Sequence, residues 1–176
     1  MPTKKPRQLM SGLLTFLVPK MIPKMSYVII FTSLIGDFCW ASSQQEMAPS
    51  IPYIECFNQA AAEYGVELPL LIAIAEKESG FNPKALNTKN LNGSFDIGIM
   101  QINSYWIKGP YVKSHFYEPC FNIKFGAYVL SDSLARWGNN WKGVGKYNAR
   151  TPSKGYVYTT DLYPRYIKYV NLLSKN

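Results

Sequence analysis

The chain has 176 residues and a formal net charge of +8 at pH 7, from 19 Lys and Arg against 11 Asp and Glu. One histidine, His115, and three cysteines cannot build a histidine-rich or cysteine-rich metal site, so we expect neither a metal nor a cofactor. The basic residues form no stripe and accompany no aromatic RNA-binding motif, so nucleic acid is not an expected partner.

The first 41 residues have the pattern of a secretory signal. Basic residues open the chain, and two apolar runs follow at residues 9–18 and 27–35, neither of them long enough to span a bilayer. The second run leads to Cys39-Trp40-Ala41, a small-x-small pattern typical of signal-peptidase sites. We therefore predict a signal peptide at residues 1–41 and one exported, periplasmic domain at residues 42–176, with membrane contact only through the signal.

Much of the basic charge belongs to this signal. Residues 1–41 hold five of the 19 Lys and Arg and one of the 11 Asp and Glu, which leaves 14 basic and 10 acidic side chains and a net charge of +4. An excess of this size suits an anionic polymer but does not identify one.

The cysteines also favour export. Cys39 leaves with the signal, so Cys56 and Cys120 remain as an even pair in a compartment that permits oxidation. We predict a disulfide between them, and two free buried thiols are the alternative.

Two helices are predicted at the start of the exported domain. The first covers residues 53–64 and ends at Gly65. The second covers residues 70–79, because Pro69 suits the first turn of a helix and Gly80 suits the position just after its end.

Glu78 is the candidate acid of the second helix. At about 100° per residue it falls on one face with Leu71, Ile74 and Ala75, at the end of an apolar stripe. Partial desolvation and the negative end of the helix dipole both raise the pKa of such a carboxyl, which a general acid working near neutral pH requires. The alternative is that Glu78 caps a solvated helix end.

Asp96 is a second candidate carboxylate. Asn92-Gly93 between Leu91 and Phe95 is a strong turn signal, so we predict a small hairpin that carries Asp96. Asp96 either faces Glu78 across a cleft and assists it electrostatically, or bonds its own turn.

The remaining chain is predicted to be mostly helical. Residues 109–119 are expected to form a loop, and residues 122–137 a helix in which Gly126 and Ala127 let another helix come close. A short helix is predicted at residues 141–149.

The end of the chain is predicted to hold a loop and a last helix. Residues 152–155 are expected to form the loop, and Thr160 or Asp161 to cap the helix. Its predicted apolar face consists of Tyr163, Tyr166, Ile167, Val170 and Leu173. The pattern as a whole predicts an α+β fold, mostly helical, with a small β-hairpin and lysozyme-like proportions.

Four short segments carry a resemblance to a known family. They are ESGFNP at residues 78–83, DIGIMQINS at 96–104, PCFNI at 119–123 and YNA at 147–149. With these segments the chain resembles the lytic transglycosylases of bacteria over roughly residues 50–150. It is most similar to the small members that accompany type III and type IV secretion systems, conjugation machines and some pili.

The resemblance implies a lysozyme-like fold in which Glu78 is the only obligatory catalytic residue. Such enzymes cleave the β-1,4 bond between N-acetylmuramic acid and N-acetylglucosamine and form a 1,6-anhydromuramyl end. Peptidoglycan strands are the implied substrate, and a secretion, conjugation or pilus apparatus is the implied partner.

The resemblance also implies roles around the groove. Ser79 would orient the substrate or Glu78, and Tyr147 and Asn148 would hold the Glu78 side chain and an N-acetyl group. The alternatives are a packed aromatic for Tyr147 and a helix cap for Asn148. The residues expected to line the sugar subsites are Gly98, Met100, Gln101 and Asn103, although Met100 could equally be plain core.

Two positions depart from the family pattern. Ile99 replaces a more usual Leu, and Arg150 stands where Gly is common, so a left-handed backbone there would cost about 1 kcal/mol. Two alternatives to the transglycosylase remain. One is a hydrolytic muramidase in which Asp96 and water complete the chemistry, and the other is a non-catalytic peptidoglycan-binding accessory subunit.

Overall fold

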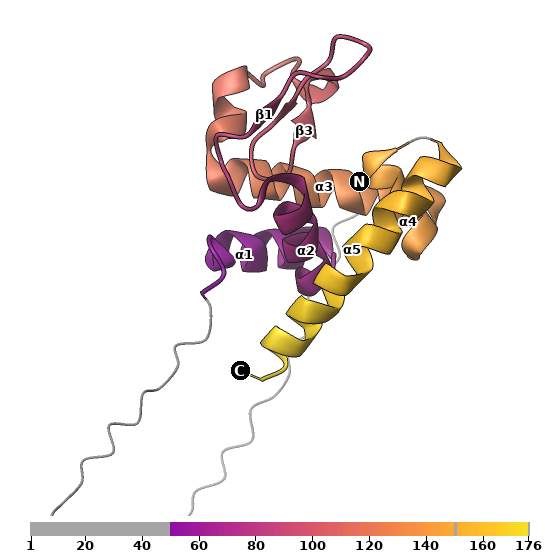
Figure 1. Ribbon diagram of the computed structural model, residues 1–176. Helices are drawn as coiled ribbons and strands as arrows, with labels where there is room; N and C mark the ends of the chain where they lie inside the picture. Colours follow the sequence, from indigo (N-terminus) through magenta and orange to yellow (C-terminus); the bar gives the residue numbers. More distant parts are fainter. Residues whose placement is uncertain (1–49, 150, 176) are drawn as a thin grey trace, which may run out of the picture. The chain divides into compact units, whose positions relative to one another are not determined.

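The computed structural model describes residues 50–149 and 151–175 of the chain (Figure 1). The predicted signal peptide, residues 42–49 and Arg150 therefore lie outside the described residues. None of the helices within the described ranges is long and apolar enough to cross a membrane. The elements in chain order are α1 (Ile54–Tyr64), α2 (Leu68–Ser79), β1 (Leu86–Asn87), β2 (Asp96–Ile97), β3 (Ile102–Asn103), the 3-10 helices η1 (Ser104–Trp106) and η2 (Lys113–Tyr117), α3 (Pro119–Trp137), α4 (Trp141–Asn148) and α5 (Pro152–Leu173).

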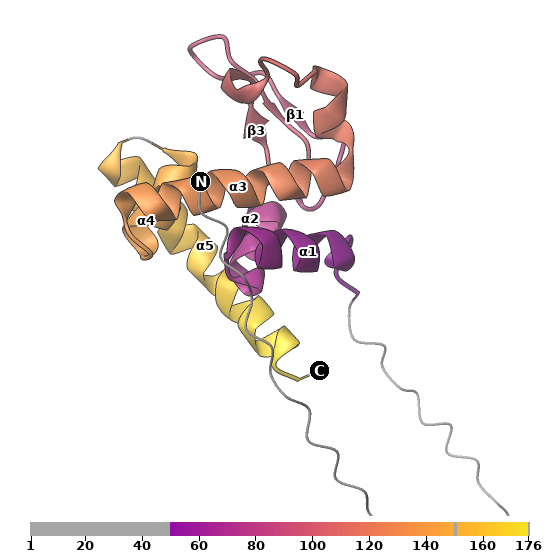
Figure 2. The same cartoon turned by 180° about the vertical axis from the view of Figure 1, so that it is seen from behind.

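The helices pack on one another around α2 and α3. α1 and α4 pack against α3, and α5 packs against both α2 and α4. The small sheet lies on the other side of α3 from α1 and α5, as the two opposite views show (Figure 1, Figure 2). The predicted α+β class, mostly helical with a small hairpin, is confirmed.

α2 lies at the centre of the core. Six consecutive residues from Leu70 to Ala75 are buried, so the apolar surface runs around this helix and is wider than the predicted stripe. Gly80 ends the helix with a left-handed backbone (φ 60°), and Pro69 lies in its first turn. α1 also matches its prediction, and it ends at Gly65 with φ 63°.

The predicted hairpin is confirmed, and a third strand extends it. β2 pairs antiparallel with β1 and with β3, so that Asp96 stands opposite Asn87 on one side and Asn103 on the other. The Asn92-Gly93 turn lies in the β1–β2 connection, where the Asn92 side chain accepts from the Ser94 N–H at 3.1 Å.

The turn between β2 and β3 is fixed by Asn122 of α3. This side chain is fully buried. It accepts from the Met100 N–H at 2.7 Å and donates to the Ile97 and Phe116 carbonyls at 3.0 and 2.9 Å. Gly98 fits beneath it with φ 77°, and a Cβ there would lie 2.7 Å from the Asn122 Cγ. One buried amide therefore joins the sheet to α3.

α3 begins earlier than predicted, at Pro119, and η2 forms inside the segment predicted to be loop. Gly126, which was expected with Ala127 to let another helix come close, meets the Met100 side chain first. A Cβ at Gly126 would lie 2.6 Å from the Met100 Cγ, so the glycine makes room for the Met100 side chain.

The prediction for the last helix is wrong at its start. α5 begins at Pro152 and continues to Leu173, so the predicted loop at residues 152–155 is helical. Gly155 is a packing residue: α4 approaches so closely that a Cβ on Gly145 would lie 3.1 Å from the Gly155 Cα. A proline followed three residues later by a glycine suggested a loop, whereas the proline opens the helix and the glycine lets a neighbouring helix come close.

The predicted apolar face of α5 is also displaced. Tyr163 is 49% exposed, whereas Tyr158, Leu162 and Tyr169 are buried. The other predicted members of that face are only half-buried: Tyr166, Ile167, Val170 and Leu173. The buried side of the helix therefore includes Tyr158, which precedes the predicted start.

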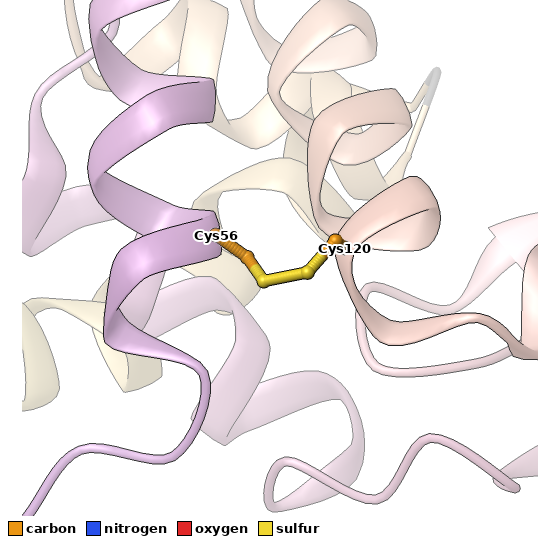
Figure 3. The surroundings of a disulfide bond; sticks show 2 residues. All are labelled: Cys56 and Cys120. Carbon is orange, nitrogen blue, oxygen red and sulfur yellow. A yellow bond between two sulfur atoms is a disulfide. The ribbon is translucent and has the colours of Figure 1, made fainter.

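A disulfide joins the first turn of α3 to α1, between Cys120 and Cys56 (Figure 3). The predicted pairing is thus present in the structure.

Candidate active site

The candidate site is built around Glu78 in the last turn of α2. Its side chain is half-buried between α2 and the N-terminal half of α5. The Tyr158 hydroxyl of α5 donates a 2.7 Å hydrogen bond to Glu78 Oε1. One carboxylate oxygen of Glu78 is therefore held by α5.

The pKa of Glu78 is raised from 4.5 to about 7, chiefly because burial disfavours the anion. The hydrogen bond from Tyr158 and the charge of Lys77 act in the opposite direction, and the charge of Asp96 adds to the rise. A carboxyl with this pKa can both give and take a proton near neutral pH.

Tyr158 was not predicted as a site residue. It is buried, and burial and the Glu78 charge hold its own pKa well above 10, so it remains a donor. It was missed because its segment was expected to precede the last helix. The available signal was the spacing of Gly155, Tyr158 and Leu162 after Pro152, which is helical from the proline onward.

Ser79 ties the end of α2 to the turn between β2 and β3. Its hydroxyl donates to the Ile99 carbonyl at 2.8 Å and accepts from the Asn82 N–H at 3.1 Å. Ser79 thus fixes the loop next to Glu78 through backbone groups. Ile99 itself is fully buried.

Tyr147 supports the same turn from α4. Its hydroxyl donates to the Met100 carbonyl at 2.9 Å. Burial of Tyr147, and to a lesser extent the charge of Glu78, raise the pKa of this hydroxyl. The hydroxyl that donates to Glu78 in the structure is that of Tyr158, while the Tyr147 hydroxyl, expected to hold Glu78, donates to the Met100 carbonyl. Asn148, also expected to help hold Glu78 and an N-acetyl group, is exposed and lines the pocket beside Glu78.

The four residues expected to line sugar subsites differ in exposure. Met100 is fully buried, so its side chain belongs to the core, and Gly98 is buried beneath Asn122. Gln101 adopts φ 47°, and its amide donates to the Gly98 carbonyl at 2.9 Å. Asn103 is half-buried on β3. The buried pair shapes the turn, and Gln101 and Asn103 are partly exposed.

Asp96 is held by three amide groups. Its Oδ2 accepts from Asn87 and Asn90 at 3.0 and 2.9 Å, and its Oδ1 accepts from Asn103 at 2.7 Å. Asn87 and Asn90 belong to the same hairpin as Asp96, so these contacts fit the predicted alternative in which Asp96 bonds its own turn, while Asn103 of β3 adds a bond across the sheet. The charge of Asp96 reaches Glu78 and adds to the rise of the Glu78 pKa.

A pocket of about 660 Å³ opens beside Glu78. Its lining residues come from α2, α4 and α5 and are Lys77, Glu78, Asn148, Ser153, Lys154, Val157, Tyr158 and Asp161. In the described part of the chain, no three or more His, Cys, Asp or Glu side chains are grouped to hold a metal ion. Glu78 gives this site a group for proton transfer, because its raised pKa lets it give and take a proton near neutral pH.

Comparison with known proteins identifies the family. Residues 55–155 match the family described as "Transglycosylase SLT domain". The chain is 38% identical to "Protein IpgF" of Shigella flexneri over 129 residues, which cover 68% of this chain and 84% of that protein. It is 38% identical to "Invasion protein IagB" of Salmonella typhimurium (strain SL1344) over 121 residues, 66% and 72% of the two chains.

A third relative is "X polypeptide" of Escherichia coli (strain K12), 32% identical over 126 residues, which cover 64% of this chain and 72% of that protein. Among solved structures, a lysozyme from Litopenaeus vannamei matches with 25% identity and a TM-score of 0.40, covering 62% of this chain and 94% of that one. The family match spans more than half of the chain and contains Glu78, Asp96 and Tyr147. The chain therefore belongs to the transglycosylase SLT family of lytic transglycosylases.

Proposed function

We propose that the protein is a peptidoglycan lytic transglycosylase that cleaves the β-1,4 bond between N-acetylmuramic acid and N-acetylglucosamine and leaves a 1,6-anhydromuramyl end. The observation that carries this proposal is Glu78, a desolvated carboxyl with a pKa of about 7, held on one oxygen by Tyr158 beside an open pocket. The family of the chain supports the same reaction.

In the first step, protonated Glu78 gives its proton to the glycosidic oxygen as the bond from that oxygen to C1 of the muramyl residue breaks. In the second step, the Glu78 carboxylate takes the proton of the muramyl C6 hydroxyl, and the C6 oxygen forms a bond to C1. Glu78 ends the cycle protonated, and no water is consumed. The acetamido group of the substrate can stabilise the positive charge at C1, so a carboxylate nucleophile is not required.

The environment of Glu78 suits both steps. A pKa near 7 leaves a substantial fraction of the acid protonated at neutral pH, and its anion is still basic enough to accept the hydroxyl proton. Because Tyr158 occupies Oε1, the proton is transferred from and to Oε2, which fixes its direction relative to the sugar.

A hydrolytic muramidase is the second candidate, and Asp96 is the observation that favours it. Three amides hold the Asp96 carboxyl on β2, and its charge acts on Glu78, so a second carboxylate is available that could direct water to C1. The two reactions differ in product, because hydrolysis leaves a reducing end and transglycosylation leaves an anhydro end.

We further propose that the protein acts on peptidoglycan in the periplasm and opens the wall locally for a secretion or transfer apparatus. The resemblance to small specialised transglycosylases supports this role, as does the name of the relative "Invasion protein IagB".

The experiment that tests the reaction compares two Gln substitutions on α2. Purified exported protein is incubated with peptidoglycan, and the released muropeptides are analysed by mass spectrometry. We expect 1,6-anhydromuropeptides from the wild type and from the Glu76→Gln control, and almost none from folded Glu78→Gln. Unimpaired turnover by Glu78→Gln would overturn the assignment of Glu78. A folded wild type that binds peptidoglycan without releasing any product would favour the accessory subunit.

A further inference from the structure

A lysine lies directly beside the proposed acid. Lys77 precedes Glu78 on α2, and its side chain is only 18% exposed. Its ammonium nitrogen lies 5.0 Å from the centre of the Tyr158 ring, the ring whose hydroxyl holds Glu78. A cation in this position favours the glutamate anion, which opposes the protonated state that the first step needs.

Asp161 of α5 binds this lysine. Its Oδ2 forms an ion pair with Lys77 Nζ, and its Oδ1 accepts from Arg165 Nη1 at 2.9 Å. Asp161 follows Tyr158 by three residues, so both side chains lie on the same face of α5, and both line the pocket with Glu78. Hydrogen bonds from Lys77, the larger effect, and from Arg165 lower the pKa of Asp161, so its carboxylate is anionic at neutral pH.

The charged and titratable groups around Glu78 come from four elements. Lys77 is on α2, Asp96 on β2 and Tyr147 on α4, while Tyr158, Asp161 and Lys154 are on α5. Tyr147 and Tyr158 are neutral, because burial holds their pKa values well above 10. Lys77 is the cation that reaches Glu78, and Asp161 is the anion bound to it.

We propose that Asp161 is a positioning residue for the reaction: it holds the Lys77 ammonium group and neutralises its charge, so that Glu78 stays protonated at neutral pH. This inference rests on the proposed function of Glu78 as the acid. It predicts opposite effects for the two partners of one ion pair. Removing the Asp161 charge leaves the cation uncompensated and favours the Glu78 anion, whereas removing the Lys77 charge disfavours that anion.

The chain offers a matched control for the structural part of this ion pair. Lys168 of α5 and Glu76 of α2 also join the two helices, with 2.8 Å between Nζ and Oε1. Neither lines the pocket beside Glu78, whereas Lys77 and Asp161 both do. Removing this second pair loosens the same helix contact without changing the charge beside the acid.

The experiment measures the titration of Glu78 in four proteins: Asp161→Asn, Lys77→Met, the double variant, and Glu76→Gln/Lys168→Met. The side-chain carboxyl of Glu78 is followed by carbon NMR, and the alkaline limb of kcat/KM is measured in parallel. We expect the midpoint of the Glu78 titration to fall by about half a pH unit in Asp161→Asn and to rise by a similar amount in Lys77→Met. The double variant should return close to the wild-type midpoint, and the control pair should lower only the melting temperature.

The inference is overturned if the two single variants shift the midpoint in the same direction, or if neither shifts it. Failure of the proposed function is a separate outcome. In that case the wild type releases no muropeptides, while the NMR titration of Glu78 still shows whether Asp161 and Lys77 shift it in opposite directions.

Discussion

At the scale of single residues, the raised pKa of Glu78 means that ionisation of this side chain destabilises the folded protein. Burial favours its protonated form, so the folded protein holds a proton between pH 4.5 and about 7 that the unfolded chain has released. The free energy of unfolding therefore falls as pH rises through this window. The buried carboxyl that the proposed reaction needs therefore lowers the free energy of unfolding above neutral pH.

Glu78→Gln should accordingly be more stable than the wild type in alkaline solution. The amide can still accept the Tyr158 hydrogen bond but carries no charge to desolvate. We expect an advantage of about 3 kcal/mol near pH 8 that disappears near pH 4. Urea unfolding at the two pH values measures it, and an advantage of equal size at both would contradict the explanation.

Glu76→Gln on the same helix should behave oppositely. The net pKa of Glu76 is lowered: burial raises it, but the hydrogen bond from Lys168 and other contacts outweigh burial. Its anion stabilises the fold above the unfolded pKa, and this contribution is lost as pH falls. Glu76→Gln should therefore be the less stable variant at neutral pH.

Tyr158→Phe tests the hydroxyl that holds Glu78. Since this hydrogen bond lowers the Glu78 pKa, its loss should move the alkaline limb of kcat/KM to higher pH, and the loss of orientation should reduce kcat about 10- to 100-fold. Tyr166→Phe is the matched control, because its hydroxyl donates to Glu67 at 2.8 Å between the same two helices. If the alkaline limb of kcat/KM moved equally in both variants, Tyr158 would have no specific effect on the pKa of Glu78.

Asp96→Asn should have the opposite effect on pH dependence. Removing this anion should shift the alkaline limb to lower pH and cut turnover about 10- to 100-fold if Asp96 stabilises charge at C1. The structure adds a stability cost, because an amide at this position would direct an N–H at groups that already donate. A folded variant with the wild-type rate and limb would leave Glu78 as the single catalytic carboxylate.

At the scale of elements, two glycines bring α5 into place. Gly145 of α4 and Gly155 of α5 lie so close that no side chain fits between them, and Tyr158 follows Gly155 by less than one turn. The contact between α4 and α5 therefore determines where the Tyr158 hydroxyl lies relative to Glu78.

Gly145→Ala should push the two helices apart. We expect a destabilisation of about 1 to 3 kcal/mol despite the better helix propensity of Ala, together with reduced turnover. Denaturant unfolding and muropeptide release measure the two effects. Lys142→Ala, on the exposed face of α4, is the control, and a Gly145→Ala enzyme of wild-type stability would show that the contact is not tight.

The elements also show what the sequence could and could not reveal. The bounds of α2 and the position of Glu78 followed from Pro69, Gly80 and the spacing of apolar residues, because local signals determine helix ends. The start of α5 was missed because Gly155 was expected to be a loop residue, whereas its role is a contact with α4; the helical spacing after Pro152 was the local signal that the prediction did not use. Tyr158 was missed for the same reason.

The buried amide of Asn122 is a second case. Its segment contributed to the family resemblance, but its three hydrogen bonds to the β2–β3 turn and η2 join segments far apart in the chain. Met100 was expected at the sugar subsites or in the core. Its side chain fills the space above Gly126, so it belongs to the core. Tertiary contacts, which sequence spacing does not contain, settle such positions.

At the scale of the whole molecule, the site depends on three supports around α2. The β2–β3 turn is held from α3 by Asn122 and from α2 by Ser79, and α5 brings Tyr158 from the other side. α3 is itself fastened to α1 by the disulfide between Cys56 and Cys120, which are 64 residues apart (Figure 3).

Replacing both cysteines by serine should lower the melting temperature clearly while leaving the residues around Glu78 in place. A cross-link over this separation stabilises by roughly 4 kcal/mol on the chain-entropy model. Calorimetry of Cys56→Ser/Cys120→Ser measures the loss, and the wild type with added reductant should approach the same value. Two titratable thiols in native exported protein would contradict the pairing.

The measurement that tests the central claim most directly is the product formed in water enriched in oxygen-18. Transglycosylation closes the muramyl C6 oxygen on C1, so the released muropeptides should be anhydro species that contain no heavy oxygen. Hydrolysis would instead place a solvent oxygen on C1. Anhydro products without label, lost in Glu78→Gln and kept in Glu76→Gln, are the predicted result, and labelled reducing ends from the wild type would contradict it.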